Sequence, residues 1–362
     1  MKKIRIAALF IFAFSIGLFF SQCQRTPGNV QVNLANLPYP KLSDYGFFTG
    51  RMIQHIPNEG VLPYDLITPL FSDYAGKKRF VWMPEGTTAQ YTEQDAFDFP
   101  VGTVLIKTFY YPSDFRKPNE KKQILETRLL VHLEDGWEAY PYIWNSRGTE
   151  AKLSWVGGEK KVSWIDESGE KQTLNYLIPN RNQCKSCHEK KGEMVPIGPK
   201  ARNLNMDFNY PEGVKNQLAK WQSVGYLTGL EKAPEDVYAV ANYQDESESI
   251  NRRARAYLDI NCGHCHNPKG PAHTSGLNLD YWEENASRLG VCKAPVAAGR
   301  GSGNRPFGIY PSRPEGSIIL FRMESTNPGI MMPEIGRRLA HTEGVELVRE
   351  WIAEMQPSEV CP

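Results

Sequence analysis

The sequence has little net charge and few cysteines. Lysine and arginine number 42 against 41 aspartates and glutamates, which gives a formal net charge of +1. A chain this close to neutral lacks the broad positive field that binds nucleic acid, and it has no strong electrostatic affinity for a membrane surface. We therefore expect no nucleic acid partner. Only seven of the 362 residues are cysteine, so closely spaced cysteine pairs are unlikely to be accidental.

Recognisable catalytic motifs are also missing. The glycine-rich segment 300–304, RGSGN, lacks the preceding strand and following helix of a phosphate-binding loop. In the N-terminal half, His55 and His132 stand apart from other candidate catalytic residues. An isolated histidine is more often structural than catalytic, so the sequence provides no organic catalytic set.

The chain begins with a targeting segment. Lys2, Lys3 and Arg5 precede an apolar run at 6–20, which is shorter than the roughly 20 residues that cross a bilayer and is typical of an export signal. Cys23 follows in FSQC, which resembles a bacterial lipobox except for the glutamine before the cysteine. We expect residues 1–22 to be a signal peptide and the protein to reach the periplasm or cell envelope, lipid-anchored through Cys23. The alternative is cleavage nearby without lipidation.

Two short segments share the pattern Cys-x-x-Cys-His. They are 184–188, CKSCH, and 262–266, CGHCH. Two thiols about one helical turn apart can add to the two vinyl groups of one haem, and the next histidine can bind its iron. We expect two covalent c-type haems, whose ligating residues are Cys184, Cys187, His188, Cys262, Cys265 and His266. The alternative is one zinc held by four cysteines, which leaves both histidines unexplained.

A methionine is the expected sixth ligand of the second haem iron. Met332 lies in MMPE, 331–334, between an irregular segment and the last expected helix. Cytochromes c carry their distal methionine at this point, and a His/Met pair raises the reduction potential. Met331 is the runner-up, because the pattern does not separate adjacent methionines.

The sixth ligand of the first haem iron is not evident from the sequence. Met206 and Met194 both follow His188 and are the candidates by spacing. His55, His132 and His273 are further possibilities, as is an open site. Two closed haems favour an electron carrier, whereas one open haem allows peroxide or other small-ligand chemistry.

A chain of this length is expected to hold two or three domains. Runs rich in β-branched and aromatic residues, such as 101–111 and 127–133, are separated by turn signals and predict a sandwich or small barrel. Apolar periodicity predicts helices at 211–222 and 344–355 and before the second motif. We expect a multidomain α+β chain, divided as 23–37 linker, 38–180 β-rich domain, 181–246 first haem-binding region and 247–362 class I cytochrome c-like domain.

Four further residues have more than one interpretation. Lys200 and Arg202 could pair with haem propionates, or they could be solvated cations. Cys292 and Cys361 lie outside the two motifs and can pair in an oxidising compartment. Such a disulfide would join the C-terminal tail to the loop at 290–293, and the alternative is two buried thiols.

The mature chain resembles a group of bacterial dihaem c-type cytochromes of poorly defined function. The stretches that carry this resemblance are 62–74, 98–109, 182–188, 196–205, 297–303 and 331–334. The resemblance implies two covalent haems, ligated by the cysteines and histidines of the two motifs, and a periplasmic or surface location. It does not imply a substrate or a sixth ligand for the first haem.

Three functions are compatible with these features. The first, which the sequence favours, is single-electron transfer between a periplasmic redox partner and a respiratory acceptor. The second is a dihaem peroxidase-like enzyme with an open first haem. The third is a surface binding module in which the β-rich region binds a partner and the haems are ancillary.

Overall fold

The computed structural model describes residues 29–362, except 297, 358, 360 and 362. The expected signal peptide, 1–22, and Cys23 lie outside the described residues. Helices and strands occur in comparable proportions, so the class is mixed α and β, as expected. Among the described residues, every helix is too short or too polar to cross a lipid bilayer.

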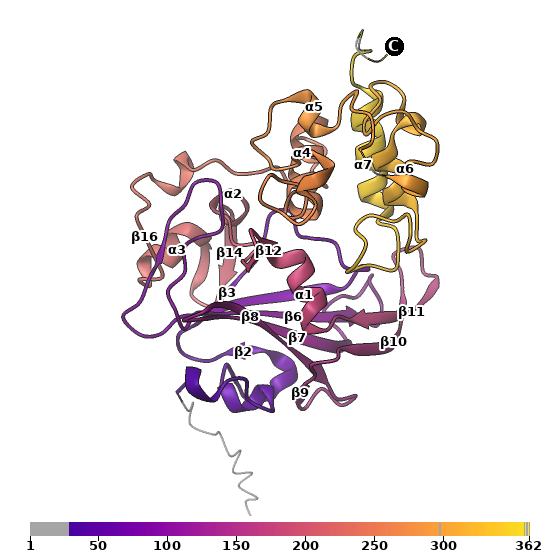
Figure 1. Ribbon diagram of the computed structural model, residues 1–362. Helices are drawn as coiled ribbons and strands as arrows, with labels where there is room; N and C mark the ends of the chain where they lie inside the picture. Colours follow the sequence, from indigo (N-terminus) through magenta and orange to yellow (C-terminus); the bar gives the residue numbers. More distant parts are fainter. Residues whose placement is uncertain (1–28, 297, 358, 360, 362) are drawn as a thin grey trace, which may run out of the picture.

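A six-stranded antiparallel sheet lies at the centre of the molecule (Figure 1). In spatial order its strands are β3 (Val61–Tyr64), β4 (Gly76–Trp82), β6 (Val104–Pro112), β7 (Lys122–Leu133), β8 (Gly136–Trp144) and β9 (Ala151–Leu153). The β-branched and aromatic runs of the sequence form β6 and β7, as predicted. The order ends at β3 and β9, so the sheet is open and does not close into the barrel that was one of the two expected forms.

Both faces of this sheet are covered. Side chains alternate between the faces along each strand, so Phe80 and Ile106 pack with the N-terminal residues Leu42 and Tyr45. The neighbouring Leu105 faces the other way, toward the segments that follow the sheet in sequence. Figure 1 shows the N-terminal turns on one side of the sheet, and α1 with the C-terminal helices on the other.

Shorter elements complete the chain. The paired strands outside the main sheet are β1 (Phe48–Thr49) with β2 (Ile56–Pro57), β10 (Gly158–Ile165) with β11 (Lys171–Ile178), β12 (Glu189–Lys190) with β13 (Glu193–Met194), β14 (Asp207–Tyr210) with β15 (Gly213–Asn216), and β5 (Ala89–Gln90) with β16 (Leu227–Thr228). The α-helices are α1 (Arg181–His188), α2 (Ala201–Leu204), α3 (Gln217–Ser223), α4 (Ile250–Leu258), α5 (Ala286–Leu289), α6 (Ile318–Glu324) and α7 (Thr342–Ala353).

The segment 211–222 differs from the predicted helix. Its first residues belong to the β14–β15 hairpin, and α3 begins only at Gln217. Gly213 has φ of +120°, a conformation that glycine adopts without steric cost. Asn216 then caps α3, because its side chain accepts hydrogen bonds from the backbone of Leu218 and Ala219. The apolar spacing was therefore a poor guide here, since turn and cap residues interrupt it.

The C-terminal helices form their own apolar cluster. Tyr257 and Leu258 of α4 pack with Val348 and Ile352 of α7. The Trp351 indole also donates a 3.0 Å hydrogen bond to the Asn251 side chain. These helices were predicted from periodicity, and the structure confirms both.

A disulfide joins Cys292 to Cys361, with the two Cα atoms 5.3 Å apart. The bond closes a loop across a sequence separation of 69 and fastens the end of the chain to the segment after α5. Cys361 is buried. A cross-link over a loop of this length stabilises the folded state mainly by restricting the unfolded chain.

Replacing both cysteines, as Cys292→Ser with Cys361→Ser, should lower the free energy of unfolding by about 2–4 kcal/mol. The measurement is urea denaturation under non-reducing conditions. Adding a reductant should destabilise the unsubstituted protein and leave the double variant unchanged. An equal effect of the reductant on both proteins would contradict a disulfide at this position.

Candidate functional site

The two Cys-x-x-Cys-His motifs lie against each other in space. The Cys265 thiol is 3.9 Å from the backbone oxygen of Ser186, and the Cys187 and Cys265 thiols are hydrogen-bonded to each other. The backbone NH of Lys191 also donates a 2.8 Å hydrogen bond to the carbonyl of Lys269. Segments far apart in the sequence therefore form one site.

The first motif is carried by α1, which has a well-defined start. The Asn180 side chain accepts a hydrogen bond from the backbone NH of Gln183 at 2.9 Å, and the Gln183 side chain accepts one from the backbone NH of Asn180 at 3.0 Å. This reciprocal capping satisfies two backbone donors that the helix itself cannot satisfy. The helix then places Cys184, Cys187 and His188 on the wall of one cavity.

The second motif follows α4 through a π-helical turn, Asp259–Gly263. Gly263 allows close packing there, because a Cβ atom would lie only 2.9 Å from the backbone oxygen of Leu279. The Asn267 side chain donates a hydrogen bond to the Gly263 carbonyl at 2.8 Å. The backbone NH of Leu279 donates to the carbonyl of His266 at 2.8 Å. These contacts fix the turn that carries the cysteines and the histidine.

Both motif histidines are oriented through one ring nitrogen. His188 Nδ1 lies 2.8 Å from the backbone oxygen of Val195, so Nδ1 must be the donor. His266 Nδ1 lies 3.1 Å from the Ser275 hydroxyl, whose single proton is donated to the Ala272 carbonyl at 2.7 Å. His266 Nδ1 is therefore also a donor. Each ring is left with an unprotonated Nε2, which is the atom that binds a metal.

Burial keeps these rings neutral. Desolvation lowers the pKa of His188 to about 4, although the contact with Val195 opposes the shift. Desolvation likewise lowers the pKa of His266 to about 4. A neutral imidazole is the form that ligates a metal ion, so both side chains are in a ligating state at neutral pH.

Two adjoining cavities meet the motifs. The first, of about 170 Å³, is lined by Cys184, Cys187 and His188, and the second, of about 630 Å³, is lined by Cys265 and His266. The second lies within the range of about 300–1,000 Å³ typical of ligand sites, and the first is below it. A set of residues lines both cavities: Cys187, Asn261, Cys262, His264, Met323, Met332, Pro333 and Ile335.

Of the two adjacent methionines, only Met332 lines these cavities. Met331 is buried elsewhere and is not among the described residues of either wall. The backbone oxygen of Met332 accepts hydrogen bonds from Arg337 at 2.8 and 3.2 Å. The segment that holds Met332 is thereby fixed between the two motifs.

The other candidates for the sixth ligand of the first haem iron lie elsewhere. Of the described residues, Met194, Met206, His55, His132 and His273 are all absent from the wall of the first cavity. His55 packs against Phe48 on the far side of the sheet. His132 stacks on Trp137, and its Nδ1 is 2.8 Å from the Phe99 carbonyl.

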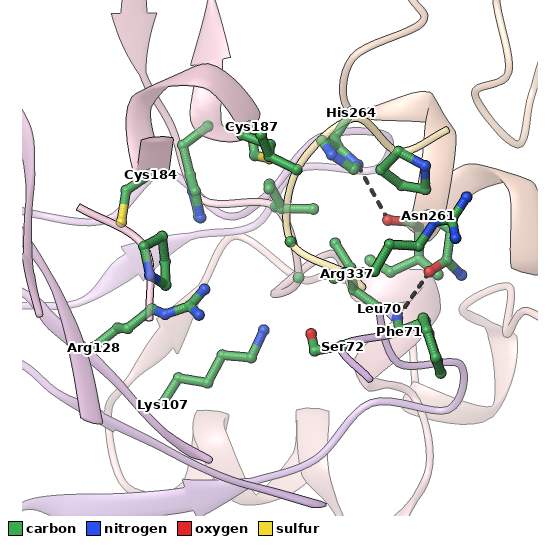
Figure 2. Close-up of a pocket in the computed structure, with 18 of the residues that line it drawn as sticks. Leu70, Phe71, Ser72, Lys107, Arg128, Cys184, Cys187, Asn261, His264 and Arg337 are labelled. Carbon is green, nitrogen blue, oxygen red and sulfur yellow. Dashed lines mark hydrogen bonds between the residues drawn. The ribbon is translucent and has the colours of Figure 1, made fainter. Parts of the chain in front are cut away.

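The first cavity has a cationic wall that the sequence analysis missed. Arg79, Lys107, Arg128 and Arg337 all line it. Figure 2 shows Lys107 and Arg128 on the side opposite His264, with the Lys107 amine directed toward the open centre. The sequence feature that could have indicated this wall is the lysine within the apolar run VLIKTF at 104–109. His264 was likewise overlooked, since it is a variable position of the motif.

The described residues do not form the shared zinc site that was the alternative to haem. Within residues 29–362 as described, no group of three or more histidine, cysteine, aspartate or glutamate side chains could hold a metal ion. The four motif cysteines are free thiols.

Cys187 has the surroundings of a reactive cysteine. The hydrogen bond with Cys265 lowers the pKa of Cys187, burial opposes this shift, and His264 lowers the pKa further. The thiolate, which is the reactive form of cysteine, is thus favoured at Cys187.

Lys200 and Arg202, the residues expected near haem propionates, are engaged in a buried ion network. Arg202 is 1% exposed and contacts Asp259 at 3.0 Å, and Lys200 contacts the same carboxylate at 3.3 Å. Both cations also approach Asp280. Burial would raise the pKa of Asp259, but the two cations outweigh it and hold the pKa below its usual range. The network anchors the turn of the second motif.

Comparison with known proteins adds nothing to this assignment, because no family model, curated protein or solved structure matches the chain.

Replacing Asp259 by Asn should destabilise the protein by about 3–5 kcal/mol, because Arg202 and Lys200 would lose their buried partner. Since the folded-state pKa of Asp259 is depressed, its contribution is complete above about pH 4 and is lost as the pH falls through the folded value. Urea denaturation as a function of pH measures both effects.

The matched control for this variant is Glu93→Gln, which breaks the exposed pair with Lys232. An exposed pair contributes at most about 1 kcal/mol. Equal stability losses in the two variants would show that the Asp259 network does not hold the turn.

Proposed function

We propose that this protein is an exported dihaem c-type cytochrome that transfers single electrons between a periplasmic redox partner and a respiratory acceptor. The observation that carries the proposal is the contact between the two Cys-x-x-Cys-His motifs, which meet through Cys187 and Cys265. Haem iron supplies one-electron redox chemistry when it is bound. Haems attached at these neighbouring cysteines would lie near each other, which would allow direct electron exchange.

The residues present fit two covalent haems. Cys184 with Cys187 and Cys262 with Cys265 supply free thiols at the required spacing. His188 and His266 each keep Nε2 available for iron, because Nδ1 is held by Val195 and Ser275 respectively. Met332 lines both cavities and supplies a thioether. This donor set is soft sulfur and imidazole nitrogen, which suits haem iron.

The protein contributes orientation and exclusion of water. Hydrogen bonds at Nδ1 fix the plane of each imidazole and raise its basicity as a ligand. Apolar side chains such as Leu105, Leu130 and Ile335 line the first cavity beside the motif. Apolar surroundings limit the reorganisation that accompanies a change of charge.

The resemblance to bacterial dihaem cytochromes is consistent with this proposal. Five of the stretches that carry it, 62–74, 98–109, 182–188, 196–205 and 331–334, contribute residues to the wall of the first cavity. Export to the periplasm or cell envelope, with a lipid anchor at Cys23, is part of the proposal and is supported by the N-terminal sequence.

A pyridine haemochrome assay on the protein produced with a c-type haem maturation system should give two haems per chain. Cys184→Ser with Cys187→Ser should reduce the count to one, and so should Cys262→Ser with Cys265→Ser, because each thiol pair holds one haem. The matched control is Cys292→Ser with Cys361→Ser, which should retain both haems. A count of zero in the unsubstituted protein would refute the proposal, as would a failure to exchange electrons with a small carrier cytochrome.

Replacing Met332 by Ala should abolish the methionine-to-iron charge-transfer band and lower the reduction potential of one haem, because a thioether ligand raises that potential. Visible and near-infrared spectra with a redox titration measure the effect. The matched control is Met331→Ala, which should retain the band since Met331 lies away from both cavities. Loss of the band in Met331→Ala alone would reverse the assignment.

A second candidate function is a dihaem peroxidase-like enzyme with an open first haem. The observation that favours it is the placement of Met194, Met206 and the isolated histidines, which are all away from the described wall of the first cavity. The same spectra distinguish the two functions. A high-spin component that shifts on addition of cyanide would favour the enzyme, and low-spin bands alone would favour the carrier.

A further inference from the structure

Three cations lie side by side across the central sheet. Arg79 of β4 is the direct partner of Lys107 of β6, and Lys107 is the direct partner of Arg128 of β7. All three side chains line the first cavity. Cross-strand neighbours of like charge destabilise a sheet unless groups of opposite charge compensate them.

Acidic residues compensate only the two ends of the row. Arg79 forms an ion pair with Asp65. Arg128 forms a bidentate pair with Glu126, with distances of 2.6 and 2.8 Å. Among the described residues, Lys107 has no carboxylate within ion-pair distance, and its amine lies 5.0 Å from the centre of the Phe109 ring. The centre of the row therefore lacks the carboxylate partner that both of its neighbours have.

Arg79 has hydrogen-bonding capacity to spare in the same place. Its side chain is 4% exposed, yet the buried Nη2 has no hydrogen-bond partner. A buried guanidinium nitrogen without a partner is destabilising. An anion bound in the cavity would supply the acceptor that this nitrogen lacks.

The charged side chains on the wall of the cavity are all basic. It contains Arg79, Lys107, Arg128 and Arg337, and of the described residues that line it none is an aspartate or glutamate. Burial, followed by repulsion from Arg79, Lys77 and Arg128, holds the pKa of Lys107 well below its usual range. An anion beside Lys107 would reverse that penalty.

We propose that the row Arg79, Lys107 and Arg128 is an anion site that binds a carboxylate or a small oxyanion in the first cavity. The planar guanidinium groups suit the paired oxygens of such an anion, and the lysine adds a point charge. The anion has two possible sources of the same chemistry. One is a propionate of the haem held by Cys184, Cys187 and His188, which rests on the proposed function. The other is a free oxyanion, which does not.

The cavity has room for a small free anion. A volume of about 170 Å³ accommodates an ion of the size of sulfate. Sulfate is therefore a suitable probe, because it presents several oxygens and is a weak ligand for haem iron.

The test is isothermal titration of the full-length protein with sodium sulfate at constant ionic strength, balanced with sodium chloride. It is carried out on the protein as isolated and on Cys184→Ser with Cys187→Ser, which prevents attachment of the first haem. Lys107→Met is then introduced into whichever form binds sulfate. We expect it to weaken binding about tenfold or more, because a charge-assisted hydrogen bond contributes about 1.5–3 kcal/mol. The control is Lys161→Met, which changes an exposed lysine on β10.

The arms of this experiment distinguish the two sources. Sulfate binding to both forms identifies a free oxyanion. Binding only when the first haem is not attached shows that the haem takes the place of the free anion, and the reduction potential of Lys107→Met then tests for a propionate. Binding by neither form would overturn the proposal, and so would equal effects of Lys107→Met and Lys161→Met. If the chain carries no haem at all, the proposed function fails, while the sulfate titration still decides the anion site.

A second measurement covers the case in which the cysteine double variant does not fold. In the protein as isolated, Lys107→Met should lower the reduction potential of one haem and alter its dependence on pH, whereas Lys161→Met should not, if a propionate lies on the row. An unchanged potential together with no sulfate binding would overturn the proposal.

Discussion

The contact between α1 and the turn that follows α4 is the constraint on which the rest of the site depends. It brings Cys187 beside Cys265 although the two motifs are far apart in sequence. Such a contact requires two rigid supports. The main sheet supports α1 from below, and the buried ion network of Arg202 and Asp259 holds the turn after α4. Helix α2, which follows the first motif in sequence, thus anchors the turn of the second motif.

Much of the local structure could be predicted from the sequence. The runs at 101–111 and 127–133 form sheet strands, and the periodic segments before the second motif and near the C-terminus form α4 and α7. Each of these predictions depends on a hydrophobic pattern that extends over many residues. The helix expected at 211–222 was wrong for the first half of its length, because Gly213 and Asn216 impose a turn and a cap within three residues of each other. Apolar spacing does not register such local backbone preferences.

The site was less predictable, since it depends on which segments become neighbours. The cysteines and histidines of the motifs were identified by their spacing alone. The cationic row could not be, because Arg79, Lys107 and Arg128 become adjacent only through the register of three strands. Lys200 and Arg202 were identified as notable cations, but their carboxylate partners lie some 60–80 residues further along the chain. Sequence pattern does not pair charges across such separations.

The wall shared by the two cavities has a structural consequence. Met332, Pro333 and Ile335 line both, so one short segment shapes two sites. If haems are attached at both motifs, as proposed, a displacement of this segment at one haem would alter the protein surroundings of the other. A single substitution in the segment would then change the spectra of both haems.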